Sequence, residues 1–93
     1  MAVGPFLDTG RVPLEPPEGW EEVEGALQRE FRFNDFAHAI DFVNRVAEVA
    51  EEANHHPDVV IQWNRVTLRW GTHAAGVVTG RDIELAGRTN ELA

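Results

Sequence analysis

The longest pattern in the sequence is an apolar periodicity of helical spacing between residues 35 and 53. It consists of two neighbouring stripes, one of Phe36, Ile40, Val43, Ala47 and Ala50, the other of Phe42, Val46, Val49 and Ala53. Asn34 and Asp35 supply an N-cap, while Asn54 suits a left-handed helix end and Pro57 prevents the helix from resuming. The pattern therefore predicts a helix over residues 35–53, with an apolar face wide enough to contact another subunit as well as a sheet.

Two segments before this helix show the alternation of β-strands. Residues 20–24 and 27–33 lie on either side of Gly25 and Ala26, and in the second segment every other side chain is apolar or long. A period of two is typical of a half-buried strand. We therefore expect a hairpin here. Trp20, at its start, is open to two interpretations, a core residue or a residue that supports a ligand site.

A second hairpin is predicted after the helix, over residues 59–63 and 66–70. If Asn64 and Arg65 form a two-residue turn, Trp63 lies opposite Val66, and the apolar residues of both strands share one face. This parity favours Trp63 as a core residue over Trp63 as a stacking platform for a ligand.

A capping box at Thr79-Gly80-Arg81-Asp82 then predicts the start of a last helix. The expected order is strand, strand, helix, strand, strand, helix. The fold class that follows is α+β, a four-stranded antiparallel sheet of two β-hairpins with the helices packed on one face.

Length and composition limit what such a chain does. We expect a Pro-rich extended arm over residues 1–18 and a single small domain over residues 19–93. The net charge of −8 disfavours nucleic-acid binding. No run approaches the roughly 20 apolar residues of a membrane span, and the first residues have no basic region of a signal peptide, so we expect a cytoplasmic protein. Without cysteines a core this small cannot be reinforced by disulfides, which favours a homo-oligomer.

The candidate chemistry lies in Asn54-His55-His56-Pro57, where the proline holds the backbone extended. Adjacent side chains on extended backbone point to opposite sides, which argues against both histidines binding one metal ion. A lone histidine in a loop is most simply a loop residue whose hydrogen bonds are satisfied. Here two histidines are adjacent, and a third, His73, follows the next hairpin. Imidazole exchanges protons near neutral pH, and no nucleophile stands out, so proton-transfer chemistry fits better than acyl transfer.

The spacing of seven residues resembles the signature of the pterin-4a-carbinolamine dehydratase family: Glu51, His55, His56, Pro57, Trp63, His73 and Asp82. The segments around Gly19-Trp20, residues 31–36 and Thr72-His73 are also similar to that family. The likeness covers about residues 19–92. It departs from the family at the N-terminus, where prolines replace a short helix.

The resemblance implies dehydration of 4a-hydroxytetrahydropterin to quinonoid dihydropterin without a metal or an organic cofactor. It implies that His55, His56 and His73 are catalytic, with His55 and His73 on either side of C4a and His56 as a supporting or alternative proton donor. Asp82 either polarises a histidine, closes its capping box, or does both. Glu51 either orients a histidine, binds the pterin, or is an exposed helix-end carboxylate.

The resemblance also implies a homodimer or homotetramer, without deciding between them. Some relatives act as transcriptional coactivators or assembly factors, so a non-catalytic protein-binding module is the alternative. Because assembly-type relatives lack the catalytic histidines, the three histidines of this chain favour the enzyme. A further alternative keeps the pterin but changes the pathway, from recycling the cofactor of aromatic amino-acid hydroxylases to pterin metabolism elsewhere.

Overall fold

The computed structural model describes residues 15–72 and 76–93. In these ranges the chain forms β1 (Glu21–Val23), β2 (Ala26–Arg32), α1 (Phe36–Ala53), β3 (Asp58–Gln62), β4 (Arg65–Gly71) and α2 (Gly80–Leu92). His73 and most of the predicted arm lie outside the described residues. No helix within them is long and apolar enough to cross a membrane.

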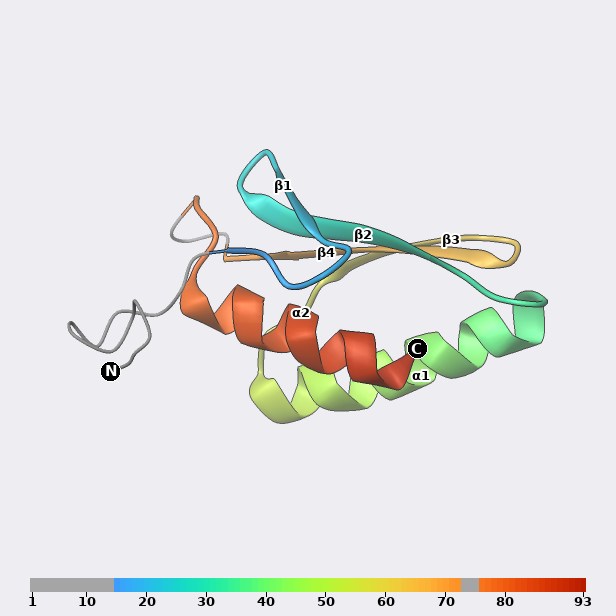
Figure 1. Ribbon diagram of the computed structural model, residues 1–93. Coiled ribbons are helices and arrows are strands. Elements are labelled where there is room, and N and C mark those ends of the chain that lie inside the picture. Colours follow the sequence, from blue (N-terminus) through green and yellow to red (C-terminus); the bar gives the residue numbers. More distant parts are fainter. Residues whose placement is uncertain (1–14, 73–75) are drawn as a thin grey trace, which may run out of the picture.

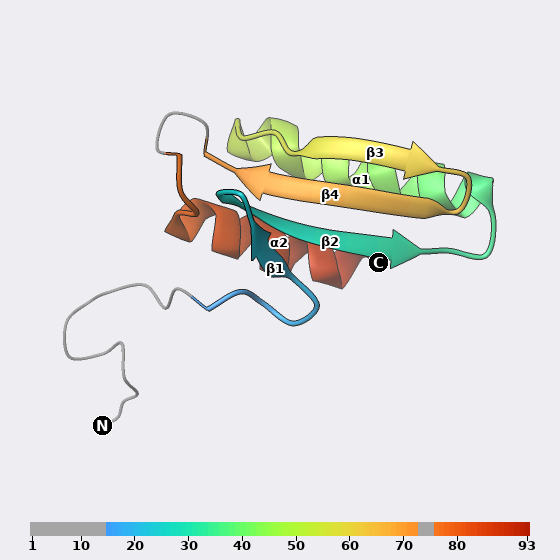
Figure 2. The same ribbon diagram turned by 90° about the horizontal axis from the view of Figure 1, so that it is seen from above.

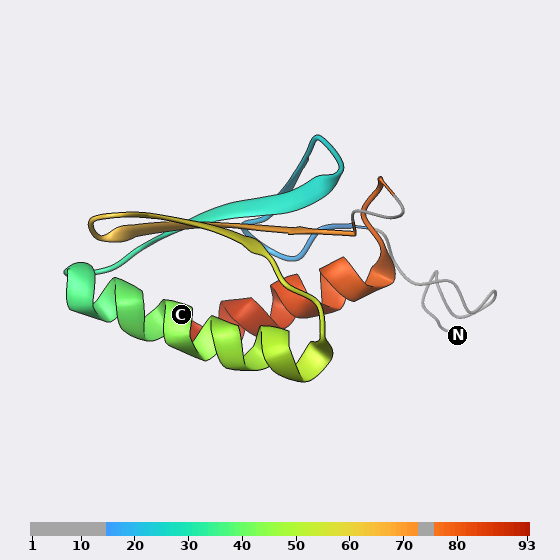
Figure 3. The same ribbon diagram turned by 180° about the vertical axis from the view of Figure 1, so that it is seen from behind.

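The four strands form one antiparallel sheet in the order β1-β2-β4-β3. Both helices pack against the same face of this sheet, as the side views show (Figures 1 and 3). Seen from above, the strands cover the helices, and β3 forms one edge of the sheet (Figure 2). The predicted fold class is therefore confirmed.

The core fills the space between the sheet and the helices. Its largest fully buried apolar side chains come from the two central strands and from both helices: Leu27, Phe42, Val46, Val66, Leu68, Trp70 and Leu85. Burial of such a side chain contributes about 1.5–3 kcal/mol relative to its exposure. The surface ion pairs contribute far less, so this cluster holds the sheet on the helices.

The first hairpin has its turn one residue earlier than predicted. Glu24 and Gly25 connect β1 to β2, both with positive φ values, 51° and 80°. Two positive φ angles are the geometry of the tight turn that matches strand twist, and glycine reaches them without strain. Ala26 consequently belongs to β2 and is buried.

Helix α1 begins and ends where the sequence predicts. Asp35 caps it by accepting a hydrogen bond from the His38 backbone N–H at 2.8 Å, and Asn54 ends it with a φ of 53°. The core face, however, is centred on the second apolar stripe and includes Ala39, whereas Phe36 of the first stripe is 52% exposed. Helix α2 packs beside α1, and this packing decides which of the two stripes is covered. The periodicity of α1 alone does not show where α2 lies.

The predicted turn of the second hairpin is wrong. The turn consists of Trp63 and Asn64, and Gln62 pairs with Arg65. Reciprocal hydrogen bonds to Phe33, both 2.9 Å long, hold Asn64 at this position. Each β3 residue is therefore paired with a β4 residue two positions away from the predicted one. A shift of two leaves every side chain on its predicted face of the sheet, but Trp63 no longer belongs to the strand. Its side chain is 70% exposed, so the expectation that it lies in the core is also wrong.

Candidate active site

His55 is positioned by the way α1 ends. Its backbone N–H donates to the carbonyl of Ala50 at 3.1 Å, beside the hydrogen bond from Asn54 to Glu51 at 3.2 Å. This pattern around a left-handed residue is that of a Schellman-type helix end. Pro57 follows, and β3 begins immediately after it. The backbone of the His55-His56 dipeptide is thus fixed from both sides.

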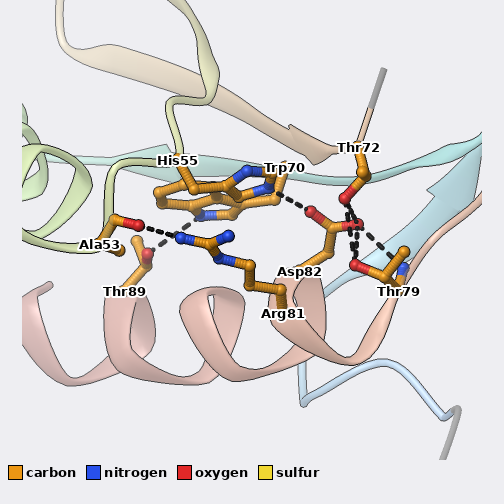
Figure 4. A network of polar contacts seen from close by, with 8 residues as sticks. All are labelled: Ala53, His55, Trp70, Thr72, Thr79, Arg81, Asp82 and Thr89. Carbon is orange, nitrogen blue, oxygen red and sulfur yellow. Dashed lines mark hydrogen bonds and ion pairs between the residues drawn. The ribbon is translucent and has the colours of Figure 1, made fainter. Parts of the chain in front are cut away.

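The His55 side chain is held between the sheet and α2 (Figure 4). Its Nε2 lies 2.7 Å from Oδ1 of Asp82, in the first turn of α2. Its ring lies nearly parallel to the indole of Trp70, with planes inclined by 14° and centroids 5.8 Å apart. The side chain is only 13% exposed, and Asp82 is completely buried. Strand β4 and helix α2 therefore fix this imidazole in one orientation.

Asp82 is the centre of a polar network (Figure 4). Its Oδ2 accepts hydrogen bonds from the Thr79 backbone at 2.9 Å, the Thr72 hydroxyl at 3.0 Å and the Thr79 hydroxyl at 3.2 Å. Burial alone would raise the pKa of this carboxyl, but the hydrogen bonds from Thr79, His55 and Thr72 outweigh it and hold the pKa below its ordinary value. Asp82 thus closes the predicted capping box and contacts a histidine as well.

His56 points away from this network, as adjacent residues on extended backbone do. Its Nε2 lies 2.6 Å from Oε2 of Glu51, in the last turn of α1. Here both side chains are exposed, His56 by 55% and Glu51 by 78%. The pair of His56 and Glu51 is therefore exposed to solvent at the rim of the site.

Two adjoining depressions open beside these histidines. The larger has a volume of about 400 Å³ and is lined by Asn54, His55, His56, Pro57, Asp58, Gly71 and Thr72. The smaller, of about 150 Å³, is lined by Glu24, Gly25, Ala26, His56, Asp58, Arg69, Gly71, Thr72 and Gly76. The larger volume is in the range of small-molecule sites. In the described part of the chain, no group of three potential metal ligands gathers.

The other candidate residues lie in different places. Pro57 lines the larger depression. Trp20 is buried in the core, where its indole donates to Asn90 at 2.7 Å, towards the end of α2 that is remote from Asp82. Trp63 is in the turn that follows β3, at the end of the sheet opposite the start of β3 (Figure 2). Neither tryptophan lines either depression. His73 is outside the described residues.

Sequence reasoning gave no role to three residues that shape the site. Trp70 is buried in the core and also stacks on His55. Thr72 donates to Asp82, and Arg69 lines the smaller depression. The position of Thr72 at the end of a strand, directly before His73, was the available signal. Arg69 had none, because its neighbours in the depression come from the β1–β2 turn and from the starts of β2 and β3.

Comparisons with known proteins agree on one family. The family model described as "Pterin 4 alpha carbinolamine dehydratase" matches residues 9–92. A protein of Thermomicrobium roseum, provisionally named as such a dehydratase, is 54% identical over 80 residues, 86% of each chain. The crystal structure of a "transcriptional coactivator/pterin dehydratase" from Brucella melitensis has a TM-score of 0.77 and 38% identity, covering 82% of this chain and 83% of that one.

A more distant structure shares the fold alone. It is a pterin dehydratase-like protein described as a RuBisCO assembly factor in the α-carboxysome. Its TM-score is 0.66, with 20% identity over 80% of this chain and 86% of that one. Chains with this fold thus include proteins named for catalysis and one named for assembly.

Proposed function

This chain belongs to the pterin-4a-carbinolamine dehydratase family, and from that premise we propose that it dehydrates 4a-hydroxytetrahydropterin to quinonoid dihydropterin. In this reaction the hydroxyl on C4a departs as water after accepting a proton, and N5 loses its proton as the C4a–N5 double bond forms. One group must donate a proton while another accepts one. The role is recycling of the pterin cofactor of aromatic amino-acid hydroxylases.

The buried pair of His55 and Asp82 is the observation that supports this proposal best. Because hydrogen bonds hold the pKa of Asp82 low, its carboxylate is an acceptor, and Nε2 of His55 must carry the proton between them. Nδ1 is then the nitrogen that exchanges a proton with the substrate. Since the ring is already held by Trp70 and Asp82, little reorientation is needed at the moment of transfer.

In the proposed site His55 and His73 act on either side of C4a, one as acid and one as base. His56 is the supporting or alternative donor, and Glu51 orients it from the last turn of α1. A flat bicyclic ring has room in the 400 Å³ depression that both described histidines line. All of this chemistry uses side chains of the protein, with no metal ion or organic cofactor.

The direct test is a dehydration assay on carbinolamine generated in situ by a hydroxylase. We expect the purified chain to accelerate product formation well above the spontaneous rate, since each well-placed proton transfer is worth about 10²–10⁴-fold. A matched control is His38→Ala, which removes an exposed imidazole in the first turn of α1 whose side-chain partner among the described residues is Asp35, the N-cap. No acceleration by the wild-type chain would refute the proposal.

We also propose that the protein is a homodimer or a homotetramer. Several large apolar side chains are exposed on the single chain: Phe36, Val59, Val60, Trp63 and Val77. Association of copies would bury part of this surface. Sedimentation at micromolar concentration measures the state, and a monomer would contradict the expectation. The cytoplasmic location stays a prediction.

The alternative is a non-catalytic module that binds or assembles other proteins. It is favoured only by the names of the two structural relatives, and one of those is too distant to show more than the fold. A module of this kind does not need a buried, ordered imidazole beside a depression. The dehydration assay separates the two functions, because a binding module would leave the spontaneous rate unchanged.

A further inference from the structure

Two polar residues of the described chain are completely buried, Asp82 and Thr89, and both belong to α2. A buried polar group costs free energy unless it is hydrogen-bonded, so its partners show what it holds in place. Asp82 holds Nε2 of His55. Thr89 lies about two turns further along α2 and is not used by the chemistry above, but it bonds a side chain that contacts the same imidazole.

That side chain is the indole of Trp70 (Figure 4). Its Nε1–H donates to the Thr89 hydroxyl at 3.1 Å, and the hydroxyl donates its own proton to the Leu85 carbonyl at 2.7 Å. Because that proton is used within the helix, the hydroxyl oxygen presents a lone pair to the indole. Thr89 therefore holds the indole by its only polar atom, while the flat face of the indole lies against His55.

The hydrogen bond to Asp82 does not by itself fix the plane of the His55 ring. The torsion about the Cβ–Cγ bond of histidine is broad, and Nε2 lies closer to the axis of that torsion than Nδ1 does. A tilt that the bond to Asp82 tolerates therefore moves Nδ1 further than it moves Nε2. Stacking on the indole, with the two planes inclined by 14°, opposes such a tilt.

We propose that Thr89 and Trp70 are positioning residues for proton transfer at His55. The Thr89 hydroxyl holds the indole, and the indole sets the plane of the imidazole. The inference rests on the proposed function, since it assumes that Nδ1 of His55 exchanges a proton with a substrate. Neither residue lines either depression, so their loss should affect turnover rather than substrate binding.

Two substitutions separate the hydroxyl from the shape of Thr89. Thr89→Val keeps the shape and removes the acceptor, and Thr89→Ser keeps the acceptor. Thr89→Val should lower kcat for dehydration by about tenfold and leave KM within about twofold, because a misaligned proton-transfer group slows turnover without weakening binding. Thr89→Ser should restore most of the wild-type kcat.

The next residue of α2 provides a matched control. Asn90 accepts a hydrogen bond at 2.7 Å from the other buried indole, that of Trp20, whose ring packs against Phe31 rather than a histidine. Asn90→Ala therefore removes the same type of bond at a distance from His55. It should lower the stability of the protein and keep the wild-type kcat.

Proton NMR of the substrate-free protein tests the geometry without turnover. Protons above the face of an indole are shielded by its ring current. At about pH 8, above the ordinary titration range of imidazole, the His55 ring protons should therefore resonate upfield of those of the exposed His38. Their loss in His55→Ala assigns them. Thr89→Val should move them towards the His38 positions, whereas Thr89→Ser and Asn90→Ala should leave them unchanged.

Equal losses of kcat in Asn90→Ala and Thr89→Val would overturn the inference, because destabilisation would then explain both. If Thr89→Val does not fold, Trp70→Phe replaces it, since phenylalanine keeps an aromatic face but has no N–H for Thr89 to hold. A folded Trp70→Phe protein with wild-type kcat would also overturn the inference.

The two measurements also separate this inference from the proposed function. Dehydration by the wild type, with unchanged His55 ring protons in Thr89→Val, would refute the positioning role and leave the proposed function. No dehydration, with ring protons that move in Thr89→Val, would refute the proposed function and leave Thr89 as the residue that sets the plane of the ring.

Discussion

The two histidine–carboxylate pairs next to α1 have nearly the same hydrogen-bond geometry and very different surroundings. Nε2 of His55 lies 2.7 Å from Asp82, and Nε2 of His56 lies 2.6 Å from Glu51. In the first pair the side chains are 13% and 0% exposed, and in the second they are 55% and 78% exposed. Distance alone would rank the pairs as equal.

Burial makes the difference between them. The Asp82 carboxylate is fixed by Thr72 and Thr79 and is buried from solvent, so the imidazole it holds has one tautomer and one orientation. Among the described residues, the Glu51 carboxylate has a single side-chain partner, His56, at the end of a helix and in solvent that screens the interaction. We infer that the buried pair sets the geometry of proton transfer, and that the exposed pair can adjust to the ligand.

The largest expected effect is on turnover. His55→Ala should lower kcat for dehydration by about 10²–10⁴-fold, the value of a positioned acid or base. His56→Ala should lose less, because the ring is more than half exposed and water can replace it. Steady-state assays on generated carbinolamine measure both, with far-UV circular dichroism to verify folding. A larger loss in His56→Ala than in His55→Ala would reverse the comparison.

A second effect is on stability. Asp82→Asn removes a charged acceptor from buried donors and should lower the free energy of unfolding by about 1–3 kcal/mol. Glu51→Gln changes an exposed residue and should stay within about 0.5 kcal/mol of the wild type. Urea unfolding at neutral pH measures both. Equal losses would mean that burial does not distinguish the pairs.

The third effect is the pH dependence of that stability. The pKa of Asp82 is lowered in the folded state relative to its ordinary value of 3.8, so in acid the unfolded chain takes up this proton first. The stabilisation that the Asp82 carboxylate contributes is therefore complete above the ordinary pKa of the carboxyl and is lost as the pH falls through its lower folded-state pKa. The difference in unfolding free energy between the wild type and Asp82→Asn should narrow from about pH 5 to about pH 3. A difference that widens over this range would contradict the assigned direction.

The sequence predicted those features of the fold that local chemistry determines. Asp35 and Asn54 act as helix caps through their own side chains or backbone, and Asp82 closes its capping box within one turn. The hairpins and the fold class followed from periodicity. The turn at Trp63 could not be predicted in this way, because the hydrogen bonds that hold Asn64 come from Phe33, some thirty residues earlier.

The candidate site shows the same division. The signature spacing singled out His55, His56, Glu51 and Asp82, but it did not pair them. The pairing of His55 with Asp82 depends on the packing of α2 below β4, which also places Trp70 against His55. The pairing of His56 with Glu51 joins the last turn of α1 to the loop that follows it. Long-range packing decides which of the two histidines is buried, so no local sequence pattern predicts it.

The smallest expected effect is on kcat/KM, and it compares Glu51 of the exposed pair with another acid of the same helix. An exposed ion pair is worth at most about 1 kcal/mol, so Glu51→Gln should lower kcat/KM by about fivefold or less. The matched control is Glu48→Gln, an exposed acid one turn earlier on α1, for which we expect no change. If orientation of His56 is all that Glu51 provides, then in His56→Ala the Glu51→Gln change should have no further effect, because nothing remains to orient. A full effect of Glu51→Gln in that background would show that the carboxylate acts on the ligand directly, and the exposed pair would then be two independent groups rather than one unit.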